Sequence, residues 1–152
     1  SQADLEAVGA VIERGDAPDF AAALAIATYD PRPYRVDTVS VVDPLLIEQD
    51  DGTTLTMVNT WTPIGGATVD EVASTLSAGI EADTAVQPGA LAFGVHASLD
   101  GSNVIAYGQW TDMASVEAFG DVIGMGGAPT FAEVFALAES VPHPYVVTAV
   151  IP

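Results

Sequence analysis

The sequence predicts an α+β domain of the ferredoxin-like type, in which one antiparallel sheet has its helices on a single face. Two observations support this fold class. Residues 54–152 alternate strand and helix patterns in the order β-α-β-β-α(α)-β, which is typical of ferredoxin-like domains. The chain has 152 residues, of which 49% are hydrophobic, and this is enough apolar material for one ordinary core.

The first half of this unit has the pattern of a strand, a loop and a helix. Residues 54–61, TLTMVNTW, are rich in threonine, valine and aromatic side chains, which favour strands. Residues 69–85 place apolar side chains at helical spacing. Thr68 and Glu71 have the spacing of a capping box, so we expect the helix to begin directly after Thr68.

The second half has the pattern of a hairpin, two helices and a closing strand. Pro88-Gly89 breaks the chain before the hairpin, and Asp100-Gly101 suits the turn between its strands. Asp112, or Thr111 before it, can cap the helix that follows. The expected elements are strands over 90–98, 103–110 and 144–151 and helices over 113–123 and about 130–139.

An internal repeat links the two ends of the chain. Shifted by 111 residues, residues 1–41 match residues 112–152 without a gap, with 18 identities in 41 positions. We interpret residues 1–50 as the second half of an incomplete first repeat, helices plus last strand, and residues 51–152 as a complete domain. The front half of the first repeat is expected to have been cleaved, omitted, or supplied by another chain.

One face of such a sheet has no helices over it. Exposure of an apolar sheet face to water is unfavourable, so another layer is expected to pack against it. We therefore expect this face to pack against a second ferredoxin-like sheet, either from the other repeat or from the partner in a homodimer.

The charge balance excludes several classes of partner. There are 21 acidic residues against 3 arginines and no lysine, a net charge of −18, so phosphate backbones and anionic membranes are not expected partners. No apolar run reaches the roughly 20 residues that span a bilayer. No signal peptide is visible, so the cytoplasm is the default compartment.

Metal and phosphate chemistry find no support in the sequence. There is no cysteine, and the two histidines are isolated, so we expect no metal site. The GMGG stretch at 124–127 follows no predicted strand, which argues against a dinucleotide-binding turn.

Three stretches resemble the antibiotic biosynthesis monooxygenase family, whose members are dimeric α+β barrel proteins. They are LTMVNTWTP at 55–63, QPGALAFGVHASLDGSNVIAYGQWTDMASVEAF at 87–119, and PHPYVV at 142–147. The resemblance implies oxidation of an electron-rich, anthrone-like polyketide by O₂, without metal, flavin or haem. It also implies roles for an asparagine on the first strand of the domain and a tryptophan that ends the third, which here are Asn59 and Trp110.

The residues themselves give both positions a chemical rationale. The Asn59 amide offers two donors and an acceptor, which suits an enolate or peroxide oxygen, although a buried amide is as often structural. Trp110 shares its strand face with Val104, Ala106 and Gly108, and these small neighbours leave room for a planar ligand. Since the two strands run antiparallel, Asn59 and Trp110 are expected at different heights, on either side of a ligand.

Four further residues are weaker candidates for the lining of a substrate pocket. Trp61 shares a strand face with Asn59, and Met57 belongs to the same strand. Tyr107 and His96 lie on the hairpin strands, and His96 could also act as a base near neutral pH. Gln109 points away from Trp110 and is expected to be structural.

Two other functions stay open at this point. The same fold could bind or cyclise a polyketide-like ligand without using O₂. It could also be an assembly module whose interior is filled by side chains, and a closed interior would exclude both enzymatic functions.

Overall fold

The computed structural model describes residues 33–41 and 54–146, together with Ala10 and Arg14. The chain divides into two compact units, Ser1–Pro33 and Tyr34–Pro152. In the first unit the Arg14 N–H donates to the Ala10 carbonyl at 3.2 Å, which is one helical turn. The second unit contains the sheet, its helices and every predicted site residue.

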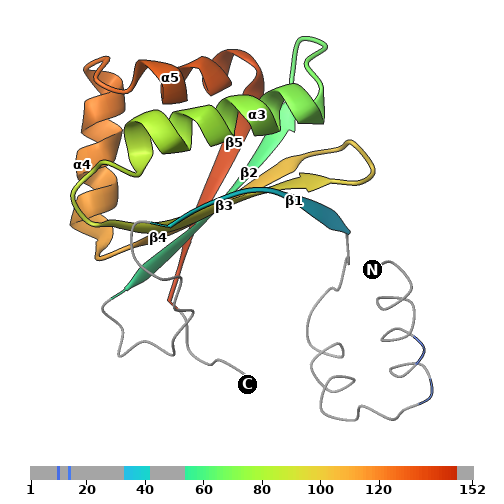
Figure 1. Ribbon diagram of the computed structural model, residues 1–152, viewed down its shortest axis with the longest axis horizontal. Helices are drawn as coiled ribbons and strands as arrows, with labels where there is room; N and C mark the ends of the chain where they lie inside the picture. Colours follow the sequence, from blue (N-terminus) through green and yellow to red (C-terminus); the bar gives the residue numbers. More distant parts are fainter. Residues whose placement is uncertain (1–9, 11–13, 15–32, 42–53, 147–152) are drawn as a thin grey trace. The chain divides into compact units, whose positions relative to one another are not determined.

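Five antiparallel strands form one sheet in the order β1-β3-β4-β2-β5 (Figure 1). The strands are β1 (Tyr34–Val41), β2 (Leu55–Pro63), β3 (Ala90–Ser98), β4 (Val104–Trp110) and β5 (Ala138–Tyr145). The predicted strand over 90–98 is confirmed with the same bounds. The expected antiparallel pairing of β2 with β4 is also confirmed.

The helices of this unit lie on one face of the sheet (Figure 1). They are α3 (Val69–Gly79), the π-helical η1 (Ile80–Thr84), α4 (Met113–Gly124), α5 (Pro129–Ala132) and the 3₁₀ helix η2 (Glu133–Ala136). The predicted ferredoxin-like α+β fold is therefore confirmed. The core lies between the two layers, where α3 buries Val72, Ala73 and Leu76 completely.

Local sequence signals fix where these helices begin. Thr68 accepts the Glu71 N–H at 3.2 Å, and the Glu71 carboxylate accepts the Thr68 N–H at 2.8 Å, so the predicted capping box is present. The Thr68 hydroxyl also donates to this carboxylate at 2.9 Å, and the hydrogen bonds that Glu71 accepts from the Thr68 backbone N–H and hydroxyl lower its pKa. At α4 the cap is Asp112, whose carboxylate accepts the Ser115 N–H at 2.8 Å.

The β3–β4 turn also follows its sequence. Gly101 has a φ of +73°, which glycine adopts without the cost that a Cβ imposes. The Asp100 carboxylate accepts the Ser102 N–H at 2.9 Å. The buried Ser98 hydroxyl accepts the N–H groups of Ser102 and Asn103, both at 3.0 Å, so the turn backbone is well satisfied.

The end of the domain differs from the prediction. The helix expected over about 130–139 is short, because α5 and η2 end at Ala136 and β5 begins at Ala138. The last strand was expected over 144–151, and residues 147–151 lie outside the described residues. Its described part begins six residues earlier and contains Pro142 and Pro144. These prolines are tolerated because β5 is an edge strand, with no partner on its outer side within the described sheet.

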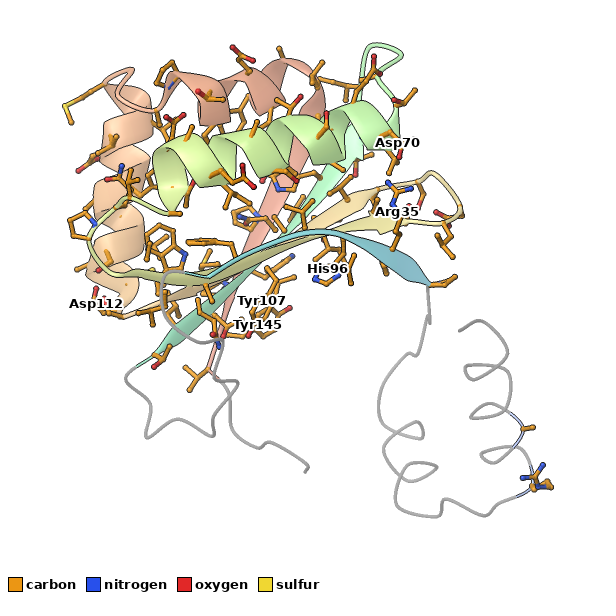
Figure 2. All side chains as sticks on the ribbon, in the orientation of Figure 1. Arg35, Asp70, His96, Tyr107, Asp112 and Tyr145 are labelled. Carbon is orange, nitrogen blue, oxygen red and sulfur yellow. The ribbon has the colours of Figure 1, made fainter. Side chains whose placement is uncertain are left out.

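Strand β1 belongs to the segment that the repeat assigns to the first copy, yet it pairs with β3 at the sheet edge. Two polar contacts fasten it there. The Tyr34 hydroxyl donates to the Asn103 side chain at 2.9 Å, and Arg35 pairs with Asp70 at the start of α3 at 2.8 Å (Figure 2). Among the described residues, no helix is long and apolar enough to cross a membrane.

Candidate functional site

A pocket of about 450 Å³ lies between the sheet and the helices. An interior filled by side chains would have excluded ligand binding, so this alternative from the sequence does not hold for the described part of the chain. Both layers contribute to the wall. The lining consists of Met57, Asn59, Trp61, Ile80, Thr84, Phe93, Ala106, Tyr107, Gly108, Trp110, Val116, Phe119, Gly120, Ile123, Phe131, Phe135, Ser140 and Pro142.

Strand β2 supplies a row of three predicted candidates to this wall. Met57, Asn59 and Trp61 alternate along the strand and therefore point to the same side of the sheet. Asn59 lies opposite Ala106 of β4 and Pro142 of β5, so its neighbours in the sheet offer it no side-chain partner. Its Oδ1 atom is buried and has no hydrogen-bond partner.

Trp110 closes the other end of the pocket. It is 4% exposed, stacks on Phe119 of α4 at 5.7 Å between ring centroids, and meets Phe93 of β3 edge-on at 5.4 Å. A Cβ added at Gly108 would lie 3.2 Å from the indole Nε1, so the indole leans back over Gly108 toward the Asn59 row. The space directly above Gly108 is thus taken by aromatic rings, so the prediction that this small neighbour of Trp110 leaves room for a ligand is wrong at Gly108.

Asn59 and Trp110 lie at different heights along the sheet, as the antiparallel pairing predicts. Trp110 is opposite Leu55, four residues before Asn59 on β2. This offset corresponds to about 13 Å along the strand. This offset separates the two backbone positions, and the indole Nε1 lies nearer to Asn59, because it sits over Gly108, which is opposite Met57.

His96 and Tyr107 are correctly placed on the hairpin strands, but their side chains point away from the helices (Figure 2). His96 is not part of the pocket lining, because alternation turns it to the opposite face from Phe93 and Val95. Its imidazole lies over Gly94 on that face, where burial lowers its pKa below the ordinary value. The structure therefore separates His96 from the pocket. Tyr107 borders the pocket from β4, although alternation directs its side chain to the other face.

The helix layer supplies the part of the wall that sequence reasoning missed. A chain of aromatic contacts runs across it, from Trp61 to Phe131 at 6.1 Å, from Phe131 to Phe119 at 5.3 Å, and from Phe119 to Trp110. Such side chains at helical spacing indicate a core, and nothing in the spacing distinguishes a filled core from a hollow one. Thr84, at the end of η1, had no sequence signal at all.

One long-range hydrogen bond holds this aromatic layer in place. Helix α5 has Ala128 at its N-cap, which has no side-chain acceptor for the first-turn N–H groups. The Asp83 carboxylate of η1 accepts the Phe131 N–H at 2.7 Å and takes over that function. The position of Phe131 in the wall therefore depends on η1 as well as on α5.

The pocket is apolar and uncharged, and few of its lining side chains are polar. No carboxylate, imidazole, amine or guanidinium belongs to the lining residues. Three lining side chains have buried polar atoms without a hydrogen-bond partner, and these atoms are Asn59 Oδ1, Trp61 Nε1 and Thr84 Oγ1. In the described part of the chain no cluster of His, Asp and Glu has the arrangement of a metal site.

Solved structures with the same fold include two that match most of the described domain. SnoaB, a cofactor-independent oxygenase from Streptomyces nogalater, superposes with a TM-score of 0.56 at 21% identity, over 66% of this chain and 98% of that chain. An anthrone oxidase-like protein gives a TM-score of 0.56 at 26% identity, over 74% of this chain and 52% of that chain. No protein-family model and no curated protein sequence matches the chain. The fold is that of the dimeric α+β barrel proteins.

Proposed function

We propose that this chain is a cofactor-independent monooxygenase that oxidises an electron-rich, anthrone-like aromatic substrate with O₂. The observation that carries the proposal is the open pocket itself. It is walled by aromatic rings and bordered by Asn59 and Trp110 at separate heights. A flat aromatic ligand stacks favourably in such a space. The similarity to an anthrone oxidase-like protein, at 26% identity, supports the same class of substrate and membership of the antibiotic biosynthesis monooxygenase family.

The reaction balances without an external reductant. The substrate methylene loses a proton, and its carbanion gives one electron to O₂. The two radicals combine into a peroxide anion on that carbon, which takes up a proton from water to become a hydroperoxide. The same carbon then loses its remaining proton while the O–O bond breaks. Water leaves and the carbon becomes a ketone. One oxygen atom enters the substrate, the other leaves as water, and the substrate supplies all four electrons.

The lining residues then act by stabilising the anion. Since none of them has a carboxylate or an imidazole, the proton leaves to water, and the pocket favours the ionised substrate through hydrogen-bond donors. The Asn59 amide and the Trp110 indole N–H are the two donors assigned to this role. Donors of this kind act strongly in an apolar pocket, because little water competes with them.

The test is O₂ consumption with an anthrone-like substrate, using protein freed of metals by chelation. We expect Asn59→Ala to lower kcat by about 10²-fold, the scale of one lost oxyanion donor. Trp110→Phe, which keeps a ring but loses the N–H, is expected to lower it less. Ser74→Ala, on the exposed side of α3, is the matched control. Turnover that is unchanged in both pocket variants would refute the site assignment.

A second candidate function is ligand binding without oxidation. It is favoured by the absence of carboxylates and imidazoles from the lining, since ring closure and hydrolysis normally need a general acid or base. Product formed under strict exclusion of O₂ would identify a non-oxidative cyclase. Tight binding of an anthrone with no turnover in air would identify a binding protein.

The open face of the sheet is the proposed site of a second ferredoxin-like sheet. Three apolar side chains are more than half exposed on this face, namely Val36, Val141 and Tyr145. Their cover would be the other repeat or a second copy of the chain. Light scattering distinguishes the two, because only a second copy doubles the mass in solution.

A further inference from the structure

Two buried polar atoms in the pocket wall have no role in the proposed reaction. Trp61 is 1% exposed and Thr84 is 2% exposed, and neither the indole Nε1 nor the threonine Oγ1 has a hydrogen-bond partner. Native proteins satisfy nearly all of their buried polar groups, so two such atoms on side chains that line one pocket need an explanation. A polar ligand in the pocket would provide their partners.

Trp61 cannot turn to find a partner elsewhere. Strand β2 is paired on both sides at this residue, with Val104 of β4 and with Ser140 of β5. The indole also packs against Phe131 at 6.1 Å and against Phe135 at 5.3 Å. Its N–H is therefore held in one orientation before any ligand arrives, which is the condition for selective recognition.

Thr84 is held just as firmly from the helix side. It is the last residue of η1, a π-helical turn, and such turns are frequent at functional sites. The preceding residue, Asp83, is fixed by its hydrogen bond to the Phe131 N–H. The Thr84 hydroxyl can both donate and accept, whereas the Trp61 N–H can only donate.

We propose that Trp61 and Thr84 determine substrate specificity, by hydrogen bonding to oxygen substituents on a polycyclic aromatic ligand. Trp61 donates to a carbonyl or phenolate oxygen, and Thr84 pairs with a hydroxyl group. A hydrocarbon of the same shape leaves both atoms unpaired, and a site built for hydrogen bonding rejects such analogues strongly. The consequence for turnover rests on the proposed function, whereas the binding preference does not.

The test compares the affinities of two ligands that O₂ does not attack under the assay conditions. These are 1,8-dihydroxyanthraquinone, which offers hydroxyl and carbonyl oxygens, and anthracene, which offers neither. Calorimetric titration of the full chain is expected to give at least about tenfold tighter binding of the oxygenated ligand. Thr84→Val keeps the shape of the side chain, and Trp61→Phe keeps an aromatic ring but loses the N–H. Each should weaken the oxygenated ligand about tenfold, and anthracene less.

Two controls separate recognition from general damage. Thr56→Val removes a hydroxyl that is also buried and unpartnered but lies outside the pocket lining, so it should alter neither affinity. Thr84→Ser keeps the hydroxyl and should restore the preference. If waters satisfy both atoms and no ligand does, Trp61→Phe and Thr84→Val will leave the ratio of affinities unchanged, and the proposal is overturned.

The outcomes also distinguish this proposal from the proposed function. A clear preference for the oxygenated ligand without O₂ consumption on an anthrone would refute the oxygenase and keep the specificity residues. Normal O₂ consumption with no change of ligand preference in the two variants would refute the specificity residues and keep the oxygenase.

Discussion

Gly79 of α3 lies against the backbone of α5, and its replacement by alanine tests the packing that forms the pocket. A Cβ at this position would lie 2.5 Å from the Phe131 Cα and 2.9 Å from the Phe131 nitrogen. Both are backbone atoms, so no side-chain rotation can relieve the clash. The shorter distance is about 0.9 Å below the 3.4 Å of ordinary contact, and α5 must move away by a similar amount.

The free energy of unfolding should fall in consequence. Overpacking of this kind costs about 1–3 kcal/mol. Alanine gains about 0.5–1 kcal/mol over glycine inside a helix, so we expect a net loss of about 0.5–2 kcal/mol in Gly79→Ala. The same displacement moves Phe131, which lines the pocket, so the affinity for 1,8-dihydroxyanthraquinone should fall as well.

Urea unfolding followed by tryptophan fluorescence measures this effect, since Trp61 and Trp110 are the two tryptophans and both border the pocket. The midpoint should fall while the slope m stays unchanged. Gly124→Ala is the matched control, because a Cβ at Gly124 meets nothing within 4 Å and should be neutral or stabilising. If Gly79→Ala is as stable as Gly124→Ala, the close approach of α3 and α5 is refuted.

Two further predictions concern a cap and a histidine. Asp83→Ala leaves the Phe131 N–H without its acceptor and should lower the free energy of unfolding by about 1.5–3 kcal/mol. Asp83→Asn keeps a neutral acceptor, so its free energy of unfolding should fall less. Equal decreases for the two variants in urea unfolding would contradict this. Burial lowers the pKa of His96 below 6.5, so the unfolded chain binds the proton first, and stability should decline as the pH falls below about 6.5 and through the lower folded pKa. In His96→Gln the urea midpoint should therefore change less between pH 7.5 and 5.5, and His143→Gln is the control. If the midpoint of His96→Gln depends on pH as strongly as before, this role of His96 is excluded.

The elements that the sequence predicts well are those that depend on neighbouring residues. The capping box at Thr68 and Glu71 needs only a three-residue spacing, and the hairpin at Gly101 needs only a residue that accepts positive φ. Alternation along β2 likewise placed Asn59 and Trp61 on one face, and both line the pocket. The error at β5 has the opposite origin, because prolines oppose strands except at an edge, and the edge is defined only by the assembled sheet.

The candidate site was predictable on its sheet side only. Period-two alternation assigns each strand residue to one of two faces, and one of these faces must meet the helices. His96 shows the limit, since alternation placed it correctly but gave no reason to prefer either face for a ligand. On the helix side, the wall residues Phe119 and Phe131 have the spacing of ordinary core residues. Which of them border a void depends on how closely the helices approach.

The distance between α3 and α5 is set by residues outside the pocket lining. Helix α5 has only four residues and no side-chain cap of its own, so local propensity cannot hold it. Gly79 allows its backbone to come close, and Asp83 supplies the missing acceptor across 48 residues of sequence. Neither residue touches the pocket, yet both position Phe131, which contacts Trp61 and Phe119. The width of the pocket is therefore a property of the α3–α5 contact, and substitutions at Gly79 or Asp83 should change ligand affinity without removing any group that meets the ligand.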